Sequence, residues 1–138
     1  QGFGPQSLKA LLELDIAGIE LAGFGGTNFS KVEAHRNNGT IHNELIFVGH
    51  TPEEMVTQLN NLAAQNNSYL TKQIIISGGI KDFLTGYYLN ELSNFPSVYG
   101  QASTFLKHAE MGYKDLANYV EKQIMGYRFA ASYLTIRK

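Results

Sequence analysis

The sequence predicts an α/β protein in which parallel strands alternate with helices. Short apolar runs of strand length alternate along the chain with segments of helical periodicity. Two of the runs end in paired glycines, and a short helix is expected between the last strand and the final long helix, as in many (β/α)8 barrels. A complete barrel needs about 250 residues, and the chain has 138. We therefore expect residues 1–138 to be the C-terminal half of a (β/α)8 TIM barrel, or a small open sheet that imitates one.

The first helix is expected to begin at Ser7, a plausible N-cap, and to run to about Leu14, because Leu8, Leu11 and Leu12 recur on one face. The next segment, residues 16–21, is short, apolar and partly β-branched, which is typical of a buried parallel strand. Residues 2–4 would be the tail of a further strand.

Residues 23–45 are rich in glycine and asparagine and predict a long loop without regular structure, which is usually functional or mobile. We expect residues 27–44 to be poorly ordered without a ligand. A strong helix start follows: Thr51 as N-cap, Pro52 at the first helical position, and two glutamates after it. The remaining expected elements are helix 52–65, strand 73–76, helix 82–92, strand 98–102, helix 104–109 and helix 113–134.

Composition limits the function classes. The net charge of −1 argues against a nucleic-acid surface, which is usually strongly basic. No apolar run approaches the roughly 20 residues that cross a bilayer, and the absence of cysteine is compatible with a cytoplasmic enzyme. The chain begins without a methionine, and we expect it to be part of a longer protein.

Two glycine-rich loops predict an anion site. Gly25-Gly26-Thr27 and Ser77-Gly78-Gly79 each follow an apolar run, and a lysine lies near both. Glycines let the backbone approach a ligand and point N–H groups at a phosphate. Two such loops after successive strands predict a phosphate-bearing cofactor at one end of the parallel sheet.

The motifs resemble a known family. Residues 25–29, Gly-Gly-Thr-Asn-Phe, followed by Lys31-Val32-Glu33, resemble the loop after the sixth strand of type 2 isopentenyl diphosphate isomerase, an FMN-dependent (β/α)8 barrel. Residues 77–81, Ser-Gly-Gly-Ile-Lys, resemble its FMN phosphate loop, in which an arginine stands where this chain has lysine. Residues 2–4 resemble its fifth-strand end, and residues 99–102 with 105–107 its eighth-strand segment.

The resemblance implies interconversion of isopentenyl and dimethylallyl diphosphate in isoprenoid biosynthesis, with FMN, Mg2+ and NADPH as cofactors. It implies that the Mg2+ ligands and the substrate-diphosphate residues belong to the N-terminal half. Either a homo-oligomer or association with that half is expected. The implied cofactor-binding residues are Thr27 at the flavin, Gly78, Gly79 and Lys81 at its phosphate, and Ala102 and Ser103 completing the phosphate cup; Phe29 would lie near the substrate.

Two alternatives remain open. One is another FMN-dependent barrel oxidoreductase, because Ser-Gly-Gly is common to many flavin barrels. The other is an inactive half barrel that associates through its apolar edges. Residues 47–50, Phe-Val-Gly-His, match an Asp-Trp-Gly-like family element only at the glycine, which favours this alternative for the chain in isolation.

Other side chains are interpreted structurally. The histidines lack metal-site spacing and are expected at the surface. Glu33 and Glu44 are not expected to act as an acid–base pair. The tyrosines, which recur mainly on helices, are expected to pack outside the barrel or at a subunit interface. These sets are His35, His42, His50 and His108; and Tyr87, Tyr88, Tyr99, Tyr113, Tyr119, Tyr127 and Tyr133. Phe129, Ala130 and Tyr133 are expected to continue a core-facing stripe on the last helix.

Overall fold

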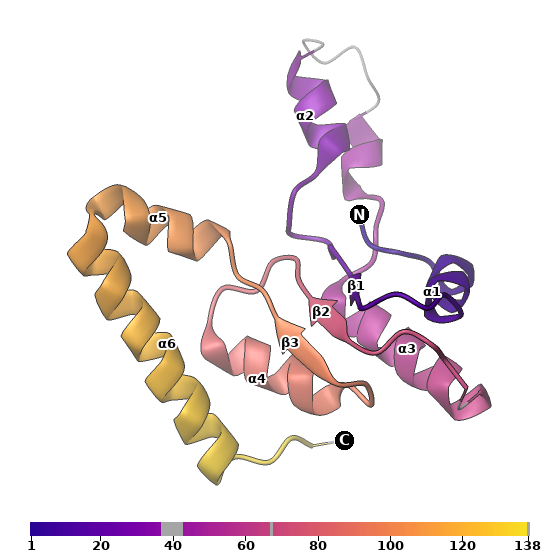
Figure 1. The fold of residues 1–138 in the computed structure, drawn as a ribbon. Coiled ribbons are helices and arrows are strands. Elements are labelled where there is room, and N and C mark those ends of the chain that lie inside the picture. The colour runs from indigo at the N-terminus through magenta and orange to yellow at the C-terminus, as the bar shows by residue number, and fades with distance from the viewer. Residues whose placement is uncertain (37–42, 67, 138) are drawn as a thin grey trace.

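A computed structural model describes residues 1–36, 43–66 and 68–137. Strands and helices alternate along this part of the chain, and a pair of C-terminal helices extends beyond the sheet on the side of the helix Phe83–Leu92 (Figure 1). The elements are α1 (Pro5–Leu12), β1 (Ile19–Glu20), α2 (Phe29–Arg36), the 3-10 helix η1 (Asn43–Phe47), α3 (Pro52–Gln65), β2 (Ile74–Ile76), α4 (Phe83–Leu92), β3 (Ser97–Tyr99), α5 (Ser103–Met111) and α6 (Tyr113–Tyr133).

The sheet is parallel and has the order β1-β2-β3. Ile19 is opposite Ile74, and Ile75 is opposite Val98. Helix α3 connects the first two strands and α4 connects the second and third, so the chain forms successive βαβ units. The predicted α/β alternation and parallel pairing are confirmed, while the half barrel stays a prediction.

One face of the sheet carries the core. Strand residues of this face pack against α1, α3 and α4 in a single apolar cluster. The opposite face is bare: Glu20 is exposed, Ile75 is 38% exposed and Val98 is 45% exposed. A parallel sheet is normally covered on both faces, so this face lacks its usual cover within the described residues. The buried cluster consists of Leu8, Leu12, Ile19, Leu21, Met55, Val56, Leu59, Ile74, Ile76, Ile80 and Leu89.

Helices α3 and α4 both begin at capping side chains, and the cap of α3 is the one that the sequence predicts. The Thr51 side chain accepts from the Glu54 N–H at 3.2 Å, and the Glu54 carboxylate accepts from the Thr51 N–H at 2.7 Å. This capping box lowers the pKa of Glu54 below its ordinary value, chiefly through the backbone hydrogen bond from Thr51. At α4, Asp82 accepts from the Thr85 N–H at 2.8 Å.

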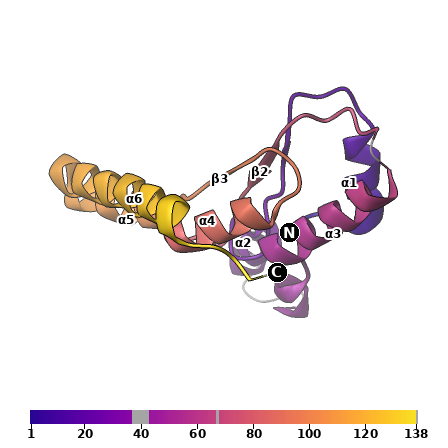
Figure 2. The ribbon, with the colours of Figure 1, turned by 90° about the horizontal axis from the view of Figure 1, so that it is seen from below.

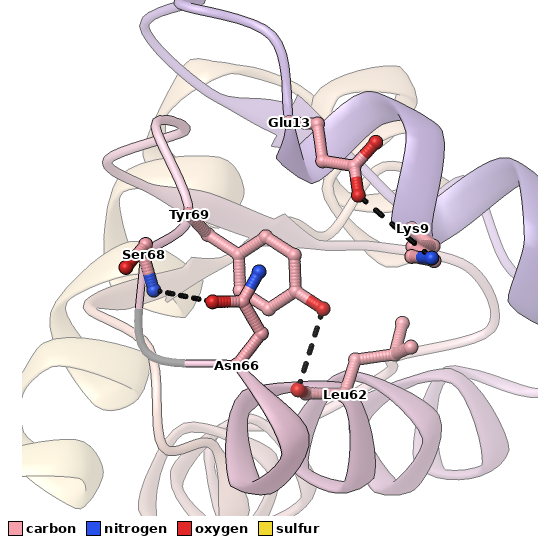
Figure 3. A network of polar contacts seen from close by, with 6 residues as sticks. All are labelled: Lys9, Glu13, Leu62, Asn66, Ser68 and Tyr69. Carbon is pink, nitrogen blue, oxygen red and sulfur yellow. Dashed lines mark hydrogen bonds and ion pairs between the residues drawn. The ribbon is translucent and has the colours of Figure 1, made fainter.

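The strand β2 is tied to the first helix through the segment before it. Thr71 is 5% exposed, and its hydroxyl donates to the carbonyls of Leu11 at 3.0 Å and Leu14 at 3.2 Å. The same two carbonyls also accept backbone hydrogen bonds, from the Leu14 N–H at 3.1 Å and the Ile16 N–H at 2.9 Å. The same segment contacts α3, because the Tyr69 hydroxyl donates to the Leu62 carbonyl at 3.3 Å (Figure 3).

Several predicted boundaries are wrong. Helix α1 begins at Pro5, with Gly4 as N-cap, because proline at the first helical position already has a helical φ; Ser7 lies inside the helix. Strand β1 contains only Ile19 and Glu20, although Leu21 continues the ladder by donating to the Ile75 carbonyl at 3.0 Å. Strand β3 ends at residue 99 rather than 102, and α5 begins at residue 103.

The prediction of an irregular loop over residues 23–45 is wrong for two stretches, which form α2 and part of η1. Helix α2 buries no side chain. It begins beside Asn28, whose side-chain oxygen accepts from the Lys31 N–H at 3.0 Å, and Arg36 pairs with Glu33 at 3.1 Å. Local hydrogen bonds, rather than the burial of an apolar face, therefore stabilise α2. The expected disorder of residues 37–42, and the surface placement of His42, lie outside the described residues.

The α5–α6 pair extends away from the sheet (Figures 1 and 2). No residue of α5 is buried, and in α6 only Ala130 is. The predicted core stripe is therefore wrong for Phe129, which is 60% exposed, and Tyr133, which is 75% exposed. Helix α6 contacts α4 and α5, and the exposure of these two side chains places them away from both contacts. Among the described residues, no helix has the length and apolarity to span a membrane.

Candidate functional site

The two glycine-rich loops meet backbone to backbone at the ends of β1 and β2. The Gly23 N–H donates to the Ser77 carbonyl at 2.8 Å. A Cβ on Gly78 would lie 2.3 Å from the Gly23 carbonyl oxygen, and one on Gly25 would lie 2.8 Å from the Gly79 Cα. The φ angles of Gly78 and Gly79 are +108° and +71°. At Gly25 and Gly78, any residue with a Cβ would displace the backbone of the facing loop. Contact between the two loops therefore explains by itself why these positions are glycine.

The end of β3 adjoins the same junction. The Gly100 N–H donates to the Ile76 carbonyl at 2.9 Å, and a Cβ on Gly100 would be in ordinary contact with the Ser77 side chain at 3.6 Å. Helix α5 begins directly afterwards, and its Thr104 hydroxyl donates to the Lys81 carbonyl at 3.3 Å. The structure therefore brings together the three strand ends that the sequence singles out, with the start of α5 beside the second loop.

Backbone donors at this place are available to a ligand. In the part of the chain that the structure describes, the N–H groups of Gly78, Gly79 and Ser103 donate no hydrogen bond. Helix α5 also has no side-chain cap. Unpaired N–H groups at a helix start and in a loop of positive φ favour an anion. Donors of this kind would suit a phosphate group.

A carboxylate lies close by, on the bare face of the sheet. The Ser77 hydroxyl donates to Glu20 Oε1 at 2.9 Å and accepts from the Ala22 N–H at 3.2 Å. Sequence reasoning missed Glu20, because it treated residues 16–21 as a strand buried on both faces. The signal was present, since a charged residue in such a strand marks a face that is not buried in apolar contacts.

The other predicted site residues have separate positions. Thr27 is exposed at the end of the first loop, and Phe29, the first residue of α2, is 77% exposed. In the described residues, neither Thr27 nor Phe29 forms a hydrogen bond with the loop of residues 77–81. Asn28 donates to the Ile46 carbonyl at 2.7 Å and so fixes η1 beside α2. The side chain of Lys81 is exposed, while its carbonyl is the acceptor for α5.

A side-chain cluster that the sequence did not predict joins α5 to α6. The ring of Tyr119 stacks on His108, with centroids 4.2 Å apart, and meets Phe105 edge-on at 5.2 Å. His108 also pairs with Asp115, and its side chain remains partly exposed. Across the described ranges, no group of three or more histidine, cysteine, aspartate or glutamate side chains could hold a metal ion.

A cavity of about 690 Å³ lies between β3 and α6. Tyr99 and Tyr127 stack at its wall, with centroids 5.8 Å apart. Its other lining residues are Asn90, Ser97, Val98, Gly100, Gln101, Phe105, Val120, Gln123, Ile124 and Arg128. The cavity shares Gly100 and Gln101 with the strand end but does not include the glycine-rich loops.

These features define a parallel α/β protein with glycine-rich loops gathered at one end of its strands. No family model matches the chain. It is 29% identical over 106 residues to the isopentenyl-diphosphate delta-isomerase of Bacillus pumilus, covering 77% of this chain and 27% of that protein. Proteins of the same name from Listeria innocua and Rickettsia bellii are 31% identical over 83 residues (59% of this chain, 22% of that protein) and 25% over 112 (80% and 31%). The chain spans less than a third of the length of these curated relatives.

Proposed function

We propose that the protein interconverts isopentenyl diphosphate and dimethylallyl diphosphate with FMN as cofactor, and that this chain supplies the FMN phosphate cup. The similarity to proteins named isopentenyl-diphosphate delta-isomerase supports the reaction. The observation that carries the assignment of the cup is the set of unpaired N–H groups at Gly78, Gly79 and Ser103, beside the start of α5.

Each part of the site has a role in this proposal. Gly78, Gly79, Ala102 and Ser103 would bind the phosphate through backbone N–H groups, and the exposed ammonium of Lys81 would add charge. Thr27 would hold the ring or the ribityl chain, and Phe29 would lie near the substrate. Reduced FMN would supply the proton-transfer chemistry at the allylic position.

Glu20 gives the chain a second polar contact for the cofactor. Its Oε1 accepts from Ser77, next to the phosphate loop, so a like-charged phosphate would be held away from it. A neutral group with an N–H donor would suit this carboxylate better. We therefore place the phosphate on the α5 side of the junction and the remainder of the cofactor over the bare face of the sheet.

The described residues do not fit a Mg2+ site, because they hold no cluster of carboxylates and histidines. No step is assigned to Mg2+ or NADPH, which stay expectations of the resemblance.

The test is a substitution in the cup of the full-length protein. Gly79→Asp is expected to abolish FMN retention, because it adds a negative charge where the phosphate would bind. Gly79→Asn is the matched control, since it has the same size without the charge, and asparagine tolerates the φ of +71°. Flavin content is read from the absorption spectrum of the purified protein. If the Gly79→Asp variant retains as much FMN as wild type, the assignment of the phosphate-binding site to this loop is wrong.

Activity separates the proposed reaction from its first rival. Turnover of isopentenyl diphosphate to dimethylallyl diphosphate by the flavin-loaded protein is expected. A protein that binds FMN but leaves this substrate unchanged would instead favour an FMN-dependent barrel oxidoreductase, for which the Ser-Gly-Gly loop is equally suited.

The bare face of the sheet favours the second rival, association of inactive half barrels. Ile75 and Val98 are exposed there beside one another in adjacent strands, and exposed apolar patches mark interaction surfaces. Sedimentation of the isolated chain tests this: we expect a species larger than the monomer and no isomerase activity. A compact monomer would contradict the association.

A further inference from the structure

The carbonyl of Lys81 joins the second glycine-rich loop to both C-terminal helices. It accepts from the Tyr119 hydroxyl of α6 at 3.0 Å and from the Thr104 hydroxyl of α5 at 3.3 Å. Lys81 stands at the end of the loop, one residue before the Asp82 cap of α4. Thr104 stands in the first turn of α5. One backbone oxygen therefore connects the loop donors at Gly78 and Gly79 to the helix start.

Tyr119 is held so that its hydroxyl keeps this direction. Its ring is stacked on His108 and meets Phe105 edge-on, and both belong to α5. The hydroxyl also lies 3.0 Å from Gln101 Oε1, on the segment between β3 and α5. Partial burial raises the pKa of Tyr119, so the hydroxyl keeps its proton and remains a donor over the ordinary pH range.

We propose that Tyr119 is a positioning residue for a phosphate group: it fixes the spacing between the Ser77–Lys81 loop and the N-terminus of α5. This inference rests on the proposed function, because it concerns the same cup. Tyr119 acts through the Lys81 carbonyl and is not itself in contact with the ligand. Its loss would therefore weaken recognition of the phosphate and leave recognition of the flavin ring intact.

The experiment compares two ligands that differ only in the phosphate. Dissociation constants for FMN and riboflavin are measured by quenching of flavin fluorescence, on the full-length protein and its Tyr119→Phe variant. Phenylalanine keeps the ring contacts with His108 and Phe105 and removes the hydroxyl alone. The loss of one such hydrogen bond is expected to weaken FMN binding about five- to tenfold. Riboflavin binding is expected to stay unchanged.

Two further variants complete the design. Tyr87→Phe is the matched control, because the Tyr87 hydroxyl donates to the Leu134 carbonyl at 2.7 Å, and Leu134 follows α6, at the end opposite α5; neither ligand should bind differently. Thr104→Val removes the second donor to Lys81 and should weaken FMN binding in the same selective way. It serves as the test if Tyr119→Phe does not fold.

The outcomes are distinguishable. Equal FMN affinity in wild type and in the Tyr119→Phe and Thr104→Val variants overturns the positioning role while the proposed function stands. Equal losses for FMN and riboflavin also overturn it, because they indicate general damage to the fold. A wild-type protein that binds neither flavin overturns the proposed function together with this inference.

Discussion

The region that contains α1, β1, α3 and β2 and the region that contains α5 and α6 are built differently. The first contains eight of the eleven residues of the buried core cluster, including Leu8, Leu59 and Ile76. The second buries Ala130 alone among the described residues of its two helices. Its helices are joined to the rest by tyrosine rings, amides and single hydroxyl groups. Apolar burial therefore stabilises one region, and specific contacts position the other.

The largest expected difference comes from removing a leucine in each region. Leu59→Ala, at a fully buried position, should lower the free energy of unfolding by about 2–5 kcal/mol, because it leaves a cavity in the core. Leu106→Ala, on α5, changes a side chain that is 63% exposed and should cost less than about 0.5 kcal/mol. Urea denaturation measures both. Similar losses for the two variants would show that α5 is stabilised by apolar burial after all.

A glycine in α6 gives the next largest effect. In an exposed helix, Gly→Ala stabilises by up to about 1 kcal/mol. At Gly126, however, a new Cβ would lie 2.5 Å from a carbon of the Phe83 ring on α4. Gly126→Ala is therefore expected to destabilise by about 1–3 kcal/mol, as overpacking does. Thermal melts followed by circular dichroism measure this change, with Asn118→Ala on exposed α6 surface as the control. A higher melting temperature for Gly126→Ala would show that the contact between α4 and α6 is loose.

The smallest effect is a pH dependence at α3. Because the folded-state pKa of Glu54 is lowered from 4.5, its contribution to stability is fully present above that value and is lost as the pH falls through the lowered pKa. Glu54→Gln keeps an acceptor for the Thr51 N–H but does not titrate. Its unfolding free energy should fall less than that of wild type between about pH 6 and pH 3. Parallel curves for the two proteins would exclude a role for the Glu54 charge.

The sequence predicted what adjacent residues encode. The start of α3 was correct because Thr51, Pro52 and Glu54 lie within four residues and satisfy one another locally. The cap of α2 by Asn28 was missed because it lies inside a glycine-rich stretch that has no apolar repeat to follow it. The two glycine-rich loops were predicted at one end of the parallel sheet, and they lie in contact there.

Contacts across long separations were not predictable. The hydrogen bond between Tyr119 and Lys81 joins residues 38 positions apart, and no periodicity relates them. The bare face of the sheet depends on what packs against it, which the run Ile74–Ile76 does not reveal. The exposure of Phe129 likewise follows from which side of α6 meets α4.

The hydroxyl of Thr71 has a consequence for the order of folding. Helix α1 has eight residues, and an isolated helix of that length is marginal in water. The Leu12 carbonyl at its C-terminal end accepts from the Leu70 N–H at 3.0 Å and the Thr71 N–H at 3.2 Å, and the two bonds of the Thr71 hydroxyl span 60 and 57 positions along the chain. The helix therefore becomes stable only after that long loop has closed. We therefore expect its amide protons and those of β2 to exchange with solvent together, as one cooperative unit.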